Sequence, residues 1–194
     1  EMRIRDRYNT QVNTYADKKE PGYKFERATA PITITTDASK NVIRVYYVKD
    51  WFKYTINYYY DGVIDTSATI NDKAAFGTTI KYTDKVQPGF KFVKADGSPL
   101  VISINEAANV INVYYQSNSY AYTVEYYYDG IINTEKTEKS AAKYNSVVND
   151  YTDKCDTGYK FEKVEGLPLT IATDESKNVI RVCLLYTSPS PRDS

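Results

Sequence analysis

The sequence has no histidine and only two cysteines, one methionine and one tryptophan among its 194 residues. Histidine is the commonest general base and a very common metal ligand in proteins, so its absence excludes the usual histidine-based catalytic and metal sites. Two cysteines are too few for a cysteine-rich zinc site. Acidic and basic residues number 25 each and are interspersed, which leaves no charged surface suited to nucleic acid or to an anionic membrane. We therefore expect no cofactor, no metal and no nucleic-acid partner.

Long apolar runs are also missing. No stretch approaches the roughly 20 residues that a membrane-spanning helix needs, and the first ten residues, EMRIRDRYNT, do not have the pattern of a signal peptide. Arg3, Arg5 and Arg7 alternate with other residues, as they would on the solvent face of a strand. We expect no direct membrane insertion in this segment, and we expect any export signal or anchor to lie outside it.

Tyrosine, in contrast, is abundant. The chain has 21, and three in a row precede Asp-Gly at residues 58–62 and again at 126–130. Tyrosine favours strands, because its ring is apolar while its hydroxyl can remain in water. Strand alternation predicts that Tyr58 and Tyr60 face the core and that the middle ring, Tyr59, points outward. Asp-Gly predicts a tight hairpin turn, which requires a positive φ that these two residues tolerate.

The chain consists of copies of one unit. Tyr54 matches Tyr122 at a separation of 68 residues, and the matching continues along the chain with one inserted residue. We predict a complete repeat at 51–118 and a nearly complete one at 119–182. We predict that residues 1–50 are an incomplete repeat that lacks its first strand. The chain is therefore expected to be a fragment of a longer array.

Residues 183–194, CLLYTSPSPRDS, depart from the repeat pattern after Val182. They resemble translated sequencing-adapter read-through, and the alternative is a disordered Ser/Pro-rich linker. We therefore leave this tail out of the predicted fold, as non-native or disordered. Cys155 stands where the other copies have Lys19 and Val86, so no disulfide is predicted.

Each repeat is expected to contain mostly strands. The first strand ends at the Asp-Gly turn, and a second runs through VIDTSATIND or IINTEKTEKS. A polar stretch follows, with at most a short helix or one or two turns. Three more strands are predicted, over YKFERA, FKFVKA or YKFEKV, then PLVISI or PLTIAT, then NVIRVYY or NVINVYY. This order predicts a β-rich α+β fold of tandem small β-grasp-like (ubiquitin-like) repeats, each only marginally stable alone because of its size.

Three of these phrases carry a family resemblance. A strand of the YTVEYYYDG type, a PGYKF strand after a turn and a closing NVIRVYY strand resemble the MucBP-like repeats of Gram-positive bacterial surface proteins, over residues 1–182. The chain differs in having YYYDG where those repeats more often have a Val-Asp step before further acidic residues and Gly. The resemblance implies an extracellular, cell-wall-attached array. Its repeats would adhere to host or microbial glycans, mucin-like glycoproteins or other extracellular ligands, or would form a stalk that projects another domain.

The side chains expected to point outward are the candidates for ligand binding. In a β-grasp sheet the first and last strands are adjacent, so Tyr59 and Tyr114 are expected to be neighbours flanked by two asparagines. An aromatic plate with amide donors suits sugar rings, which stack through C–H groups and need partners for their hydroxyls. The alternative is that the rings are cross-strand pairs that stiffen the sheet, each contributing about 0.2–1 kcal/mol. The candidates are Tyr59, Tyr127, Tyr46, Tyr114, Asn57 and Asn112.

No residue pattern predicts catalysis. Asp61 and Asp129 are turn residues, and no second carboxylate recurs opposite them as glycoside hydrolysis would require. Asp72 and Asp84 lack the dense oxygen-ligand spacing of a calcium loop. We expect no enzyme activity. Three hypotheses for the function remain open: multivalent adhesion, a purely structural stalk between neighbouring repeats, and a protein-binding module that uses an exposed sheet edge.

Overall fold

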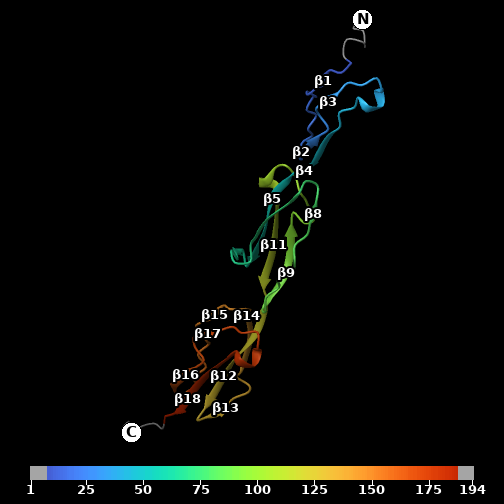
Figure 1. Cartoon of the computed structure of the whole chain (residues 1–194). Coiled ribbons are helices and arrows are strands. Elements are labelled where there is room, and N and C mark those ends of the chain that lie inside the picture. Colours follow the sequence, from blue (N-terminus) through green and yellow to red (C-terminus); the bar gives the residue numbers. More distant parts are fainter. Residues whose placement is uncertain (1–7, 188–194) are drawn as a thin grey trace, which may run out of the picture. The chain divides into compact units, whose positions relative to one another are not determined.

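The computed structural model describes residues 8–187 (Figure 1). The fold is strand-rich, as the sequence predicts, and its sheets are small. Its only helical elements are single 3-10 turns, so the described part of the chain has no α-helix and none of its helices is long and apolar enough to cross a bilayer. These turns are η2 (Ala38–Lys40), η3 (Glu106–Ala108) and η4 (Glu175–Lys177).

The order of elements from β5 to β11 recurs from β12 to β18, and β1 to β4 follow the second half of the same order. The strands are β1 (Gln11–Val12), β2 (Tyr23–Ala28), β3 (Ile32–Thr33), β4 (Val45–Lys49), β5 (Trp51–Tyr60), β6 (Val63–Ile64), β7 (Ile70–Ala75), β8 (Thr79–Ile80), β9 (Phe90–Asp96), β10 (Leu100–Val101), β11 (Val110–Ser117), β12 (Ser119–Tyr128), β13 (Ile131–Ile132), β14 (Glu138–Lys143), β15 (Val147–Val148), β16 (Tyr159–Glu165), β17 (Leu169–Thr170) and β18 (Val179–Tyr186).

The chain forms two compact units, which are described separately. The first extends to Tyr58 and includes Asp65–Thr83 and Ala95–Val113, and the second contains the remaining residues. The limits of these two units differ from the limits of the predicted repeats. The repeat boundaries therefore stay a prediction. In the first unit β2 pairs with β4, β1 with β3, β8 with β10 and β7 with β5, all antiparallel. Its core includes Ile56, Tyr58, Ile102, Ile111 and Val113.

The second unit contains a complete sheet in the order β13-β12-β18-β16, with β14 also pairing β12. The first and last strands of this copy, β12 and β18, are parallel neighbours, in register from Thr123 opposite Val179 to Tyr128 opposite Leu184. The same order, β6-β5-β11-β9, is found in the preceding copy. The buried side chains on the inner face are Val124, Tyr126, Leu169, Ile171, Ile180, Val182 and Leu184.

The predicted alternation of the three tyrosines is confirmed. Tyr58 and Tyr126 are fully buried, and Tyr60 and Tyr128 are partly buried on the same side. Each hydroxyl reaches a backbone carbonyl at the rim: that of Tyr58, for example, donates to the carbonyl of Thr83 at 2.9 Å. The rings therefore contribute apolar area to the core without leaving a buried hydroxyl unpaired.

The second strand of each repeat was predicted to be continuous, and this was wrong. β6 ends at Ile64 and β7 begins at Ile70. Between them the carboxylate of Asp65 accepts from the backbone N–H groups of Ser67 and Ala68 at 3.0 and 3.2 Å. Asn133 forms the equivalent turn in the next copy. Asp and Asn offer the backbone a local alternative to the ladder, which interrupts the strand.

The prediction that residues 183–194 lie outside the fold is wrong for residues 183–186. β18 continues through Cys183 to Tyr186, and Leu184 is buried in the core. Residues 188–194 lie outside the described part of the chain. Cys155 and Cys183 are both free thiols.

Candidate functional site

Tyr59 and Tyr114 are neighbours, as the sequence predicts. Their rings, from β5 and β11, are stacked with centroids 4.9 Å apart and an interplanar angle of 16°. The ammonium group of Lys94 lies 5.0 Å from the centroid of the Tyr114 ring, within the range of a cation–π interaction. Both rings are partly buried. All three residues belong to the second unit.

Asn57 and Asn112 are also brought together, within the first unit. The amide nitrogen of Asn57 donates to the amide oxygen of Asn112 at 3.0 Å. This hydrogen bond uses one donor and one acceptor of the pair. Within residues 8–187 no other side-chain hydrogen bond involves the two amides, so the remaining oxygen and nitrogen can bind another molecule or water.

Tyr127, the middle ring of the next copy, has no aromatic partner at the equivalent position. Cys183 is the residue directly opposite it on β18. The Tyr127 hydroxyl donates to Glu125 at 2.9 Å, and the same carboxylate forms an ion pair of 3.3 Å with Arg181. Burial raises the pKa of the Cys183 thiol above its usual value. The ion pair therefore replaces the Asn57–Asn112 amide pair of the preceding copy. The Cys183 thiol replaces the ring of Tyr114.

Tyr46, in the incomplete copy, is covered by a cation. The guanidinium carbon of Arg27 lies 4.0 Å from the centroid of the Tyr46 ring. Of the four outward tyrosines, only Tyr59 and Tyr114 are therefore stacked on each other.

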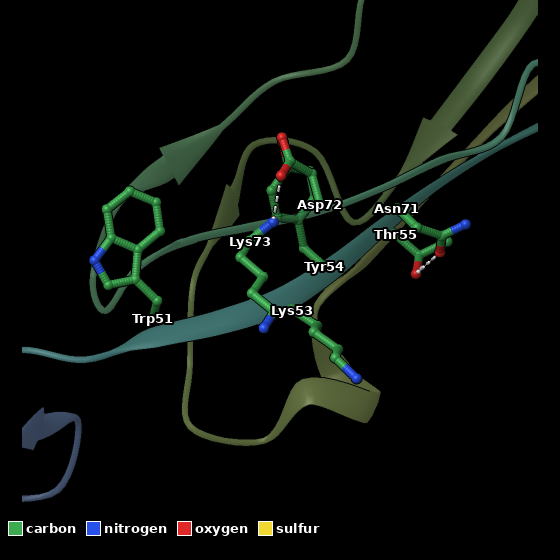
Figure 2. Close-up of a pocket in the computed structure, with 7 residues that line it drawn as sticks. All are labelled: Trp51, Lys53, Tyr54, Thr55, Asn71, Asp72 and Lys73. Atoms are coloured by element: carbon green, nitrogen blue, oxygen red, sulfur yellow. Dashed lines mark hydrogen bonds between the residues drawn. The ribbon is translucent and has the colours of Figure 1, made fainter.

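Sequence reasoning missed Trp51, the only tryptophan. Its side chain is 58% exposed at the start of β5, beside a hollow of about 410 Å³ that is shown in Figure 2. Counting back from Tyr59 in steps of two reaches Trp51, so alternation could have placed it outward. The hollow is lined by Trp51, Lys53, Tyr54, Thr55, Asn71, Asp72 and Lys73.

The connection between β4 and β5 is held by three residues far apart in the sequence. The backbone N–H of Asp50 donates to the carbonyl of Gly22 at 2.8 Å, and the N–H of Phe76 donates to the carbonyl of Asp50 at 2.8 Å. The Phe76 ring covers Gly22 so closely that a Cβ there would lie 2.4 Å from the ring. Tyr23 and Phe52 meet the same ring edge-on, at 6.0 and 6.3 Å between centroids.

The connection between β11 and β12 has the same construction. The N–H of Asn118 donates to the carbonyl of Gly89, and the N–H of Tyr144 donates to the carbonyl of Asn118, both at 2.8 Å. A Cβ at Gly89 would lie 2.4 Å from the Tyr144 ring. Phe90 and Tyr120 contact this ring at 5.7 and 6.3 Å between centroids. We call each of these arrangements an aromatic-on-glycine junction.

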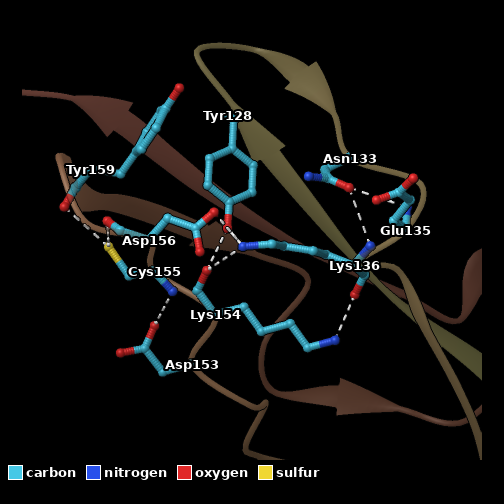
Figure 3. A network of polar contacts seen from close by, with 9 residues as sticks. All are labelled: Tyr128, Asn133, Glu135, Lys136, Asp153, Lys154, Cys155, Asp156 and Tyr159. Carbon is cyan, nitrogen blue, oxygen red and sulfur yellow. Dashed lines mark hydrogen bonds and ion pairs between the residues drawn. The ribbon is translucent and has the colours of Figure 1, made fainter.

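A polar network in the last copy, shown in Figure 3, connects the turn before β14 to the loop before β16. Lys136 pairs with Asp156 and its ammonium group donates to the Tyr128 hydroxyl at 2.8 Å. Lys154 pairs with Glu138 at 2.7 Å. The hydrogen bond that Lys136 donates to Asp156 raises the pKa of Lys136, and the hydrogen bond that Glu138 accepts from Lys154 lowers the pKa of Glu138.

We interpret this network as a structural connection between the turn and the loop, and not as a site that recurs in each copy. Lys136 and Asp156 correspond to Ala68 and Gln87 in the preceding copy, so the ion pair does not recur there. Throughout residues 8–187, no group of three or more Cys, Asp or Glu side chains is placed to hold a metal ion.

The chain matches no protein-family model, and no curated protein matches it.

Proposed function

We propose that the chain is a segment of a tandem-repeat cell-surface protein whose β-grasp-like repeats act as a structural spacer. The cell-surface part of the proposal rests on the resemblance to MucBP-like repeats of Gram-positive proteins, which would place the array outside the cell and attached to the wall. The spacer part rests on one observation, the aromatic-on-glycine junction.

The junction occurs at both connections between copies, with the same two hydrogen bonds and the same ring over a glycine. A flexible linker would leave the backbone groups of Asp50 and Asn118 to water. Here each residue instead bonds to a turn of the preceding copy and to the end of a strand of the next. Small repeats that are stable only marginally alone gain stability from such nearest-neighbour interfaces.

The outward tyrosines also support a structural role. Tyr59 and Tyr114 are stacked on each other, Tyr46 is covered by Arg27, and the Tyr127 hydroxyl is bonded to Glu125. Cross-strand aromatic pairs of this kind stabilise sheets. The four rings do not present one recurring surface, as repeated binding sites of an adhesin would.

Amide hydrogen exchange of the full chain tests this proposal. We expect the amides of Asp50, Phe76, Asn118 and Tyr144 to exchange as slowly as those in the middle of β5 and β12, because all four donate to backbone carbonyls within a packed junction. The amide of Thr66, in an exposed turn, is the internal reference for fast exchange. Exchange of the four junction amides at the rate of Thr66 would mean that the copies are flexibly linked, and the spacer proposal would fail.

Adhesion to glycans is the second candidate, and the partly exposed pair of stacked rings, Tyr59 and Tyr114, is the observation that favours it. The full chain can be tested on immobilised mucin and on a glycan array, beside a Tyr59→Ala/Tyr127→Ala variant of matched thermal stability. Binding that the variant loses would assign these rings to ligand contact. Absence of binding by both proteins, displayed multivalently, would remove glycan adhesion as a candidate and favour the spacer.

A further inference from the structure

The hollow at Trp51 is open to solvent and large enough for a small ligand. Its volume, about 410 Å³, lies within the roughly 300–1,000 Å³ typical of small-molecule sites. Figure 2 shows the indole of Trp51 standing away from the strand at one end, with the polar side chains beyond it. An exposed indole offers a flat apolar face, which is the surface on which the C–H groups of a sugar ring stack.

Two lysines occupy directly opposed positions in this hollow. Lys53 of β5 and Lys73 of β7 are Cα partners in the antiparallel ladder. Like charges directly opposite each other destabilise a sheet. Within residues 8–187 no ion pair joins either lysine to a carboxylate. The pair therefore carries two positive charges that an external anion would neutralise.

In the described part of the chain, the carboxylates near the two lysines accept hydrogen bonds from backbone N–H groups and form no ion pair with the lysine ammonium groups. The carboxylate of Asp72 accepts from the backbone N–H of Lys73 at 2.8 Å and also faces the hydroxyl of Tyr54. Burial, followed by the charge of Asp72, raises the pKa of that hydroxyl. Glu106 accepts from the backbone N–H of Lys53 at 2.8 Å.

Neutral hydrogen-bonding groups complete the hollow. Thr55 donates its hydroxyl to the amide oxygen of Asn71 at 2.9 Å. This bond leaves the amide NH₂ of Asn71 as a donor and the hydroxyl oxygen of Thr55 as an acceptor. Such groups suit the hydroxyls of a sugar.

We propose that this hollow binds an acidic sugar, a pyranose that carries a carboxylate or a sulfate group. The C–H face of the ring lies on the indole of Trp51, the anionic group lies between the ammonium groups of Lys53 and Lys73, and the ring hydroxyls bond to Thr55 and Asn71. Charge complementarity selects an anionic ligand, and the flat indole beside hydroxyl and amide groups selects a carbohydrate. The backbone N–H of Trp51 donates to the carboxylate of the junction residue Asp50 at 2.9 Å. The site is nevertheless distinct from the spacer role, since none of its side chains takes part in the two backbone hydrogen bonds of the junction.

The next copy supplies a natural control. Trp51 corresponds to Ser119, and the opposed lysines correspond to Ala121 and Ala141, which are partners at the same register. A Lys53→Ala/Lys73→Ala variant therefore introduces a pair that the chain already accommodates. It also removes a like-charge repulsion, so it is expected to fold at least as stably as the original chain.

Tryptophan fluorescence of the full chain, excited at a wavelength that tyrosine does not absorb, reports on this site alone, because Trp51 is the only tryptophan beside 21 tyrosines. The probes are 3′-sialyllactose, which carries a carboxylate, lactose 3′-sulfate, neutral lactose and a glutamate-rich peptide. We expect a saturable change with at least one of the acidic sugars, binding about tenfold or more tighter than lactose and weakening as salt is added. The first two probes distinguish a carboxylate from a sulfate ligand.

The variants separate the parts of the site. Lys53→Ala/Lys73→Ala should reduce the affinity for the acidic sugar to that for lactose, about a tenfold loss or more. Trp51→Ala removes the fluorescent reporter, so binding by this variant is measured as retention on immobilised acidic sugar. We expect that retention to be lost. The proposal is overturned if no sugar binds, if lactose binds as tightly as the acidic sugars, if only the peptide binds, or if the double lysine variant binds unchanged.

Discussion

At the residue scale, each complete copy is fastened by one buried asparagine. The side-chain amide of Asn109 donates to the carbonyls of Lys53 and Ser103 at 3.1 and 2.9 Å, and its oxygen accepts from the N–H of Ser103 at 3.0 Å. Asn178 makes the equivalent bonds, including one to the carbonyl of Ala121 at 3.1 Å. These amides connect the 3-10 turn before the last strand to the first strand of the copy.

Replacing this asparagine should be costly. We expect Asn109→Ala and Asn178→Ala each to lower the free energy of unfolding by about 2–4 kcal/mol, because several buried backbone groups lose their partner. Asn41→Ala is the matched control, since within residues 8–187 the side chain of Asn41 bonds to Thr35 and not to a first strand. Urea denaturation monitored by circular dichroism measures the difference. Equal losses in all three variants would contradict the role in fastening the first strand.

The fully buried tyrosine of the last copy should make the protein sensitive to alkali. Burial, followed by the charge of Glu138, raises the pKa of Tyr126 to about 12. A pKa that is higher in the folded than in the unfolded chain stabilises the fold below the unfolded value of 10.0. That stabilisation is lost as pH rises from there through the folded pKa.

We therefore expect Tyr126→Phe to flatten the fall in stability between about pH 10 and 12. Tyr8→Phe, at an exposed ring, is the control and should leave the slope as it is. Denaturant midpoints across this pH range measure both variants. An unchanged slope in Tyr126→Phe would show that other groups control alkaline unfolding.

At the element scale, the Asp-Gly turn does more than reverse the chain. Asp61 and Gly62 have φ values of 49° and 82°, as a tight hairpin requires. The carboxylate of Asp61 also accepts from the N–H of Ser117 at 2.9 Å, and that of Asp129 accepts from the N–H of Tyr186 at 2.9 Å. The turn thus fastens the end of the last strand beside the first.

Asp61→Ala should reduce the free energy of unfolding by roughly 1–3 kcal/mol, because alanine neither tolerates the positive φ well nor accepts the bond from Ser117. Asp61→Asn retains an oxygen at the same place and a side chain that tolerates this conformation, so it should cost much less. Thermal unfolding distinguishes the two. A similar loss in both would show that the negative charge, and not the geometry, matters.

Much of the strand arrangement could be predicted from alternation and turn residues, and each failure has a physical reason. The YYYDG phrase predicted which rings are buried and where the hairpin turns, since both depend on neighbouring residues. The break between β6 and β7 was missed because the side-chain bonds of Asp65 compete with the ladder. The hollow at Trp51 was missed because it requires the register that sets Lys53 opposite Lys73, and pairing register is not visible in one strand alone.

At the scale of the whole molecule, the aromatic-on-glycine junction is the feature that recurs between copies. The matching glycines, Gly22 and Gly89, were visible in the sequence as repeated turn residues. The rings that cover them, Phe76 and Tyr144, are more than fifty residues further along the chain. No local pattern relates a turn to a ring at that separation, so the junction emerges only from the folded chain.

Unfolding of the full chain carrying Gly89→Ala, compared with Gly62→Ala, tests the junction most directly. Both glycines have a positive φ, +87° and +82°, but a Cβ would lie 2.4 Å from the Tyr144 ring at Gly89 and would meet nothing within 4 Å at Gly62. The shared backbone strain, about 1–2 kcal/mol, cancels in the comparison. We predict that calorimetry shows the copies on either side of the junction unfolding together in the original chain and in Gly62→Ala, and separately in Gly89→Ala. Separate transitions already in the original chain, or an equal effect of both substitutions, would contradict coupling through the junction and with it the spacer account.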